Sequence, residues 1–200
     1  MAYNSTSWTT DANTKAGSTG TNTVGGVTLY AYFGLGSGIA AAWPAGEHLA
    51  LPFMGFPVTS ADADSATLGT GTDPATSLTT ADSADTDAAI WVPCMWYLPD
   101  NITIDSVTSI EGADNATGDT TRMHLMSYDF TSGSTSCLTN GTVLASNSDV
   151  TNAGSEQAYL STFTVSSSSV SSGKVILATF RQDNTTYDFS VQVIIKYHLS

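Results

Sequence analysis

The side chains best suited to chemistry are three histidines and two cysteines: His48, His124, His198, Cys94 and Cys137. No two histidines have the H-x-x-x-H spacing of a helical zinc site, and two well-separated cysteines make no zinc knuckle. Cys94 lies in the apolar run IWVPCMWYL, where burial favours an inert thiol over a nucleophile for a base such as His124. We therefore expect no metal site and no cofactor, and a Cys94–Cys137 disulfide stays an open alternative.

Carboxylates give no clearer signal. Glu47, Glu111 and Glu156 are the only glutamates, and all three fall in loop-like stretches rather than across a cleft, as glycoside hydrolysis requires. The clusters DAD (62–64) and DSADTD (82–87) could offer oxygens to Ca²⁺, but their spacing matches no EF-hand, so solvated loops are the favoured interpretation. No nucleophile elbow or phosphate loop is present. We predict that the protein is not an enzyme.

The composition describes the scaffold that would position such groups. Hydrophobic residues make up 41% of 200, enough for a core, whereas charged residues are only 12%. Ser and Thr supply the polarity and disfavour helix interiors, so the chain favours strands with polar loops. With a net charge of −13 and five Lys or Arg, nucleic-acid partners are excluded and membrane surfaces disfavoured. We expect no signal peptide and no membrane span.

Strand patterns are regular from residue 88 onward. The clearest is the closing strand, 187–199, where alternate residues are apolar or aromatic: Tyr187, Phe189, Val191, Val193, Ile195, Tyr197 and Leu199. Before it we predict strands at 88–98, interrupted at Pro93, and then at 102–110, 121–130, 142–146, 157–165 and 173–181. The segment QDNTT predicts a hairpin between the last two strands. No helix of ten or more residues is expected.

We predict an all-β, jelly-roll-like antiparallel β-sandwich with an extended N-terminal arm. Residues 1–24 would be the arm, because they show neither strand nor helix periodicity. Residues 25–87 would hold strands and a long acidic loop, and residues 88–200 the sandwich body. A structureless loop as long as 60–88 is unusual inside a compact domain, so it is either functional or a linker.

Several aromatic residues lie outside the regular strands. Tyr3 and Trp8 are the large aromatics of the arm, and Trp43, Phe53 and Phe56 lie in segments interrupted by Pro and Gly. We take all five as candidate partner-interface residues. For the last three, two other interpretations remain open: they cover an open end of the sandwich, or they form a platform for sugars.

The stretches IWVPCMWYLPDNITIDSVTSI, TRMHLMSYDF and GKVILATFRQDNTTYDFSVQVIIKYHLS resemble small β-sandwich structural proteins of tailed bacteriophages, especially marine ones. The resemblance covers residues 88–200 and carries over no catalytic residues. It implies a place on the virion surface, as a capsid decoration (cement) protein, a head fibre or a tail-fibre module. It also implies the major capsid protein and the chain itself, as a homotrimer, as partners.

The leading hypothesis is a capsid decoration protein attached to the phage head through the arm and the 25–60 segment. The alternative is a tail-fibre or head-fibre module that recognises a host-surface glycan. A hydrolase on a jelly-roll scaffold is the third, and no motif demands it.

Overall fold

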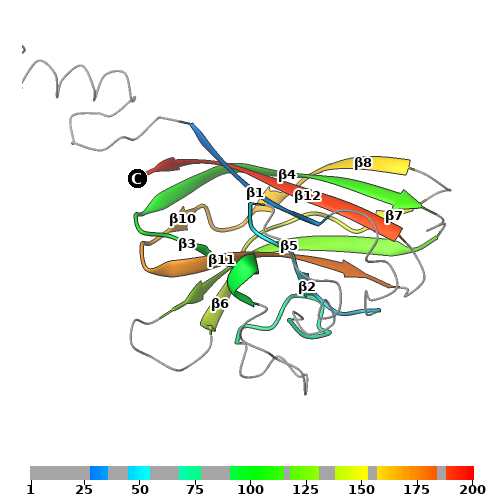
Figure 1. Cartoon of the computed structure of the whole chain (residues 1–200), viewed down its shortest axis with the longest axis horizontal. Coiled ribbons are helices and arrows are strands. Elements are labelled where there is room, and N and C mark those ends of the chain that lie inside the picture. Colours follow the sequence, from blue (N-terminus) through cyan, green and yellow to red (C-terminus); the bar gives the residue numbers. More distant parts are fainter. Residues whose placement is uncertain are drawn as a thin grey trace, which may run out of the picture.

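The computed structural model describes residues 28–35, 45–54, 68–77, 91–114, 118–130, 138–152, 157–183 and 188–200. Within them the secondary structure is β apart from one short 3₁₀ turn, η3 (Val92–Cys94), so the predicted all-β class is confirmed. The same residues include no helix long and apolar enough to cross a membrane. The strands form two antiparallel sheets packed face to face (Figure 1).

Sheet A contains the closing strand in its middle. Its order is β1 (Leu29–Leu35), β12 (Asp188–Leu199), β4 (Ile102–Asp114) and β10 (Ser169–Val170), with β8 (Gln157–Thr162) also paired to β4. Every ladder is antiparallel, and β12 pairs with β4 along its whole length. The C-terminal strand is therefore held on both sides by ladder hydrogen bonds.

Sheet B has β11 and β5 at its centre. Its order is β2 (Leu49–Ala50), β11 (Lys174–Gln182), β5 (Thr120–Asp129), β6 (Thr139–Ser146) and β9 (Thr164–Val165), with β3 (Trp96–Tyr97) beside β11 and β7 (Val150–Thr151) beside β5. All of these ladders are antiparallel as well.

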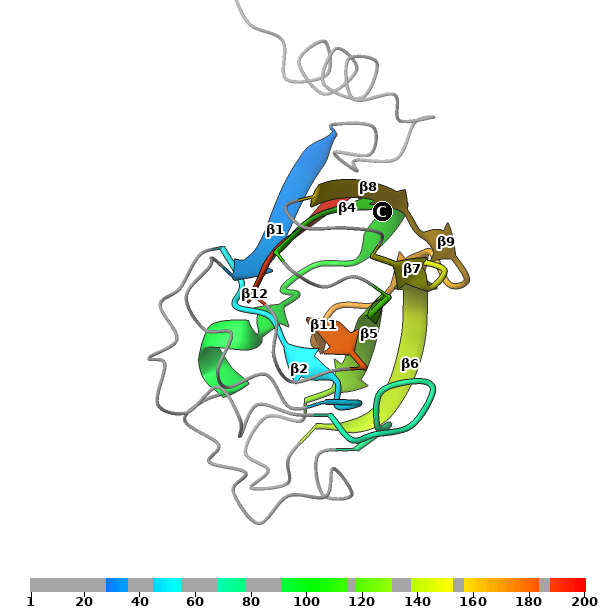
Figure 2. The ribbon, with the colours of Figure 1, turned by 90° about the vertical axis from the view of Figure 1, so that its right-hand side faces the viewer.

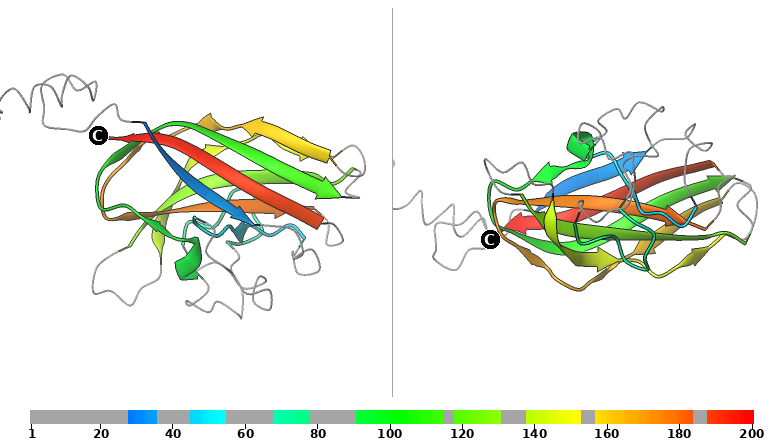
Figure 3. Two further views of the ribbon diagram at one scale, coloured as in Figure 1. Left: turned by 45° about the horizontal axis from the view of Figure 1, so that its top comes forward. Right: turned by 90° about the horizontal axis from the view of Figure 1, so that it is seen from below.

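The strand order is that of a jelly roll. Sheet A runs β1-β12-β4-β8, and sheet B places β2 and β3 beside β11, then β5 and β6. Apart from the β2–β3 and β5–β6 connections, each step between these main strands crosses from one sheet to the other, which is the double Greek-key arrangement of this architecture. Figure 2 shows the two layers end-on and Figure 3 shows them from two further directions.

The predicted hairpin between the last two strands is wrong. β11 pairs with β5 in sheet B, whereas β12 pairs with β1 and β4 in sheet A. Both strands bury an apolar face in the same core, so they pack across it instead of sharing a ladder. The QDNTT segment therefore joins the two sheets, a role that turn chemistry alone does not distinguish from a hairpin.

The core lies between the sheets and follows the predicted alternation of the closing strand. The inward residues of β12 are all buried: Phe189, Val191, Val193 and Ile195. From sheet B, Phe180 meets this row, with its ring centroid 5.1 Å from that of Phe189. Burial of each such side chain contributes roughly 1.5–3 kcal/mol. The alternation thus identifies correctly which face of β12 enters the core.

β4 is longer than predicted. Residues 111–114 were expected to begin a loop, but they continue the strand and pair with β12 and β8. Glu111 is consequently buried, against the expectation that all glutamates lie in loops. Gly112 and Ala113 gave a turn-like sequence signal, which the ladders on both sides of the strand override.

The side of sheet B away from sheet A is covered by residues 68–77 (Figure 2). Residues 45–54 instead run along the edge of β11, where they include β2, and continue to β1 of sheet A. Tyr128 of β5 donates its hydroxyl hydrogen to the Ala75 carbonyl at 2.8 Å, and the Gly141 amide of β6 donates to the Thr76 carbonyl at 2.7 Å. This cover explains why β11 and β5 are buried on both faces. Part of the stretch predicted as a long acidic loop, 68–77, is therefore a packed layer.

Gly141 permits this close packing, and we predict that Gly141→Ala destabilises the protein by about 1–3 kcal/mol. An added Cβ would lie 2.6 Å from Cε1 of Tyr128 and 2.8 Å from Cα of Thr76. Gly173→Ala is the contrasting control, because that glycine has a φ of +82° but no atom within 4 Å of the added Cβ. Hydrogen exchange at 68–77 should accelerate in Gly141→Ala alone; equal acceleration in both variants would contradict this packing.

Candidate functional site

The outer face of sheet A carries exposed apolar side chains on neighbouring strands. Tyr30 and Tyr32 of β1 are 51% and 38% exposed, Ile110 of β4 is 42% exposed and Leu160 of β8 is 75% exposed. The register aligns them in rows across the sheet: Tyr32 pairs with Ile194, and Ile110 pairs with Leu160. In the described part of the chain this face has no covering layer like that on sheet B.

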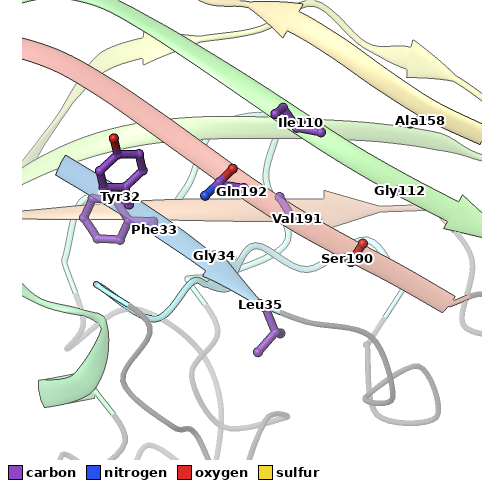
Figure 4. A pocket seen from close by; sticks show the side chains of 10 residues that line it. All are labelled: Tyr32, Phe33, Gly34, Leu35, Ile110, Gly112, Ala158, Ser190, Val191 and Gln192. Carbon is purple, nitrogen blue, oxygen red and sulfur yellow. The ribbon is translucent and has the colours of Figure 1, made fainter. Parts of the chain in front are cut away.

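A groove of about 490 Å³ crosses this face and opens to solvent (Figure 4). It is lined by residues of β1, β12, β4 and β8: Tyr32, Phe33, Gly34, Leu35, Ile110, Gly112, Ala158, Ser190, Val191 and Gln192. Gly34 and Gly112 contribute no side chain to the floor of the groove. Neither position has room for one: a Cβ at Gly34 would lie 2.8 Å from the Val191 carbonyl oxygen, and a Cβ at Gly112 would lie 2.8 Å from Ser190 Oγ.

The face is almost uncharged on a strongly acidic molecule. Four cross-strand rows lie on this side, from the row that contains Lys196 to the row that contains Ser190. In these rows of the described strands, Lys196 is the one charged residue. The other polar groups there are hydroxyls and the exposed amide of Gln192. With a net charge of −13 on the chain, this surface is suited to neutral contacts rather than to ion pairing.

A second polar cluster lies under the cover of sheet B. His124 of β5 was placed on a polar strand face by its sequence pattern, but it is fully buried. Its ring centroid lies 5.0 Å from that of His48, and its Nε2 lies 3.2 Å from Oδ1 of Asp73. His48 Nε2 lies 2.9 Å from the Gly71 carbonyl oxygen. Both rings thus fasten residues 68–77 to the sheet.

Burial lowers the pKa of both histidines. For His124 desolvation is the largest cause, the neighbouring His48 adds to it, and the pKa falls to about 4. For His48 desolvation again dominates, opposed in part by the hydrogen bond to Gly71. Neither ring reaches solvent, so a substrate would have to displace the covering residues to meet them. This is the geometry of a neutral, structural pair.

Glu111 is a buried carboxyl between the sheets that sequence reasoning missed. Its Oε2 accepts a hydrogen bond of 2.7 Å from the Thr121 hydroxyl. Burial is the main cause that raises its pKa to about 7; the nearby Asp119 raises it further, while bonds from Thr121 and Asn152 oppose the shift. The stretch VTSIEGA (107–113) does not alternate between apolar and polar residues, so the sequence carries no signal for this burial.

Most of the predicted interface residues lie outside the described residues: Tyr3, Trp8, Trp43 and Phe56. The fifth, Phe53, is half-buried at the side of the sandwich, tilted against Phe33 at 5.1 Å and stacked on Trp96 at 5.6 Å. Phe53 thus packs against the core beside the edge strand β1, which differs from the cover over an open end that was one of its interpretations. Contact of any of the five with a partner stays a prediction.

Cys94 is buried, with Sγ 3.7 Å from the Ala50 carbonyl oxygen. Burial raises its pKa to about 12, which disfavours the reactive thiolate. Cys137 and the clusters at 62–64 and 82–87 lie outside the described residues, so the disulfide and calcium alternatives are untested. Among the residues that are described, no three His, Cys, Asp or Glu side chains gather as metal ligands.

Comparison with known proteins adds no relative. A scan against protein-family models finds no match, and a search of curated proteins finds none either.

Proposed function

We propose that this chain is a structural protein of a tailed-phage particle, a capsid decoration protein that attaches through its N-terminal part. The phage assignment derives from the sequence resemblance. The observation that carries the contact role is the contrast between the two sheets: the outer face of sheet B is covered by residues 68–77, whereas among the described residues the outer face of sheet A is open and nearly uncharged. Such a molecule acts by contact rather than by catalysis.

Two further observations support this proposal. The jelly roll is an architecture shared by viral capsid domains and lectins, although fold alone never fixes function. Glu111 and His124, whose pKa values are both strongly shifted by burial, are unavailable to a substrate. The protein then belongs on the virion surface, with the major capsid protein and further copies of itself as partners.

β1 gives the N-terminal part a defined place in this arrangement. It is an edge strand of sheet A, and its far side is bordered only in part by residues 52–54, through the bonds Gly34 N to Pro52 O and Met54 N to Tyr32 O. Residues 1–24 precede it in the chain. In this proposal they hold the particle, and the outer face of sheet A is displayed.

The test is deletion of residues 1–24. We expect the truncated protein to keep the β-sandwich circular-dichroism spectrum and thermal transition but to lose co-sedimentation with undecorated capsids of its phage by about tenfold or more, equivalent to roughly 1.4 kcal/mol. Full-length protein and a Phe130→Ala variant are the controls. Undiminished binding by the truncated protein would refute attachment through the arm.

The second candidate function is a head- or tail-fibre module that recognises a glycan. The observation that favours it is the pair of exposed tyrosines beside the groove of sheet A. This candidate differs from the first in the position of the protein on the particle. In it, the outer face of sheet A binds the glycan.

A further inference from the structure

Two tyrosines form an aromatic platform at the rim of sheet A. Tyr30 and Tyr32 occupy alternate positions of β1, so their side chains leave the same face about 7 Å apart. A tyrosine ring combines an apolar body with a hydroxyl that hydrogen-bonds at its tip. The two rings therefore suit a ligand that presents both C–H surfaces and hydroxyl groups.

Uncharged polar groups continue from the platform across the sheet. Gln192 is exposed on β12 and lines the groove with Tyr32 (Figure 4). Its amide both donates and accepts hydrogen bonds, and the hydroxyls of Thr108, Thr162 and Ser190 on the same side do the same. A ligand with many hydroxyls finds both kinds of partner here without an ionic contact.

The shape favours a chain over a compact ligand. The groove is open along its length instead of enclosed, and Gly34, Gly112 and Ala158 leave its floor and far side without large side chains. An enclosed pocket would bury a small molecule on most sides, as cofactor sites do. This groove offers one broad surface that crosses several strands.

The pattern of side chains argues against a protein partner on this face. Ile110 and Leu160 are cross-strand neighbours, but the adjacent rows hold Thr108 with Thr162 on one side and Gly112 with Ala158 on the other. The apolar area is thus broken into small patches, whereas the fully buried core of a protein interface is more apolar than the surface around it.

We infer that the outer face of sheet A binds a neutral glycan chain, stacked on Tyr30 and Tyr32 and hydrogen-bonded along the groove by Gln192. This inference rests on the proposed function, in which the N-terminal part attaches the protein and leaves this face displayed. A strongly anionic glycan is disfavoured by charge, because the chain carries −13 and, in the described strands from the row of Lys196 to the row of Ser190, Lys196 is the one cationic side chain on this face.

The experiment is affinity electrophoresis of the full-length protein in native gels that contain a neutral galactan, mannan or glucan, with alginate as the anionic comparison. Binding is then quantified by calorimetry with oligosaccharides of the retarding polymer. We expect retardation by at least one neutral polymer and none by alginate. Tyr32→Ala should weaken the affinity about tenfold or more, since stacking contacts of this kind reach that range.

Two further variants make the result specific. Ala158→Trp adds bulk to the exposed side of the groove and should also abolish binding without touching the core. Tyr97→Ala is the matched control. The exposed fraction of Tyr97, 53%, is similar to the 51% of Tyr30, but Tyr97 lies on β3 of sheet B. Thermal melting of each variant confirms that it is folded.

Retardation by alginate alone, or by no polymer, would overturn the inference. So would an equal loss of binding in Tyr97→Ala, or a loss of self-association in Tyr32→Ala, which would assign the face to a protein contact. Failure here is distinguishable from failure of the proposed function. Tyr32→Ala should still co-sediment with capsids, and the protein lacking residues 1–24 should still bind the glycan.

Discussion

Glu111→Gln is expected to stabilise the protein by about 3 kcal/mol at pH 8 and to have little effect at pH 4. The carboxyl is 1% exposed, and its pKa rises from 4.5 in the unfolded chain to about 7 in the sandwich, mainly through burial. A tenfold difference in proton affinity between the folded and unfolded states corresponds to about 1.4 kcal/mol of stability. A glutamine keeps an oxygen for the Thr121 hydroxyl and never ionises.

The sign follows from the protons bound in each state. Between pH 4.5 and 7 the native protein holds the Glu111 proton and the unfolded chain does not, so the free energy of unfolding falls as the pH rises. The contribution is fully present below pH 4.5 and is lost by pH 7. His124 works in the opposite direction: its native pKa of about 4 lies below 6.5, so its contribution is present above pH 6.5 and lost towards pH 4.

Urea unfolding of both proteins at several values from pH 4 to pH 8 is the measurement. In the wild type the contribution of Glu111 opposes that of His124, while His48, whose pKa is also lowered by burial, acts in the same direction as His124. In Glu111→Gln the contribution of Glu111 is gone, so from pH 4.5 to 6.5 the stability should rise more steeply with pH than in the wild type. Parallel pH profiles for the two proteins would show that Glu111 is not buried as described.

Thr121→Val provides the matched control for this effect. It removes the hydroxyl that donates to Glu111 at 2.7 Å, a bond that lowers the pKa of the carboxyl. Its loss should raise that pKa further, and so shift the decline in stability to higher pH. The two variants thus move the pH dependence in different ways.

Phe180→Ala is expected to cost about 3–5 kcal/mol of unfolding free energy, the usual range for a buried phenylalanine. Phe180 is fully buried on β11 and meets Phe189 of β12, so it links the two sheets across the core. For a chain of this size the melting temperature should fall by roughly 2–4 °C per kcal/mol. Differential scanning calorimetry measures both quantities.

Phe130→Ala is the control for size and chemistry. Phe130 follows β5 and is 44% exposed, so its truncation should change stability by about 0.5 kcal/mol or less. Equal losses in the two variants would contradict the packing of β11 against β12 across the core.

The sequence predicted the fold class because alternation and turn chemistry are local signals. In β12, apolar residues occupy every second position from 189 to 195, with Ile194 the one apolar residue on the other face, and the buried face is the one expected. The pairing of β12 was not predictable in the same way. A five-residue link joins either two neighbours in one sheet or two strands across a core, and only the whole set of strands selects between them.

The candidate site was harder to predict, because it depends on which faces the rest of the chain covers. β5 and sheet A both carry polar residues in alternation, yet residues 45–54 and 68–77 cover His124 and leave Gln192 exposed. Tyr30 and Tyr32 lie in a stretch whose sequence shows no more than a strand rich in aromatic residues. Their importance appears only when the register places them beside Lys196 and Ile194 at the edge of an open face.

The central claim is that the protein attaches to a phage particle by its N-terminal part and displays the outer face of sheet A. The most direct test is co-sedimentation with purified, undecorated capsids, followed by cryo-electron microscopy of the saturated particles. The account predicts saturable binding at a fixed number of copies per particle, with Tyr30, Tyr32 and Gln192 facing away from the capsid. Absence of binding by folded, monodisperse protein, or sheet A packed against the capsid, would contradict it.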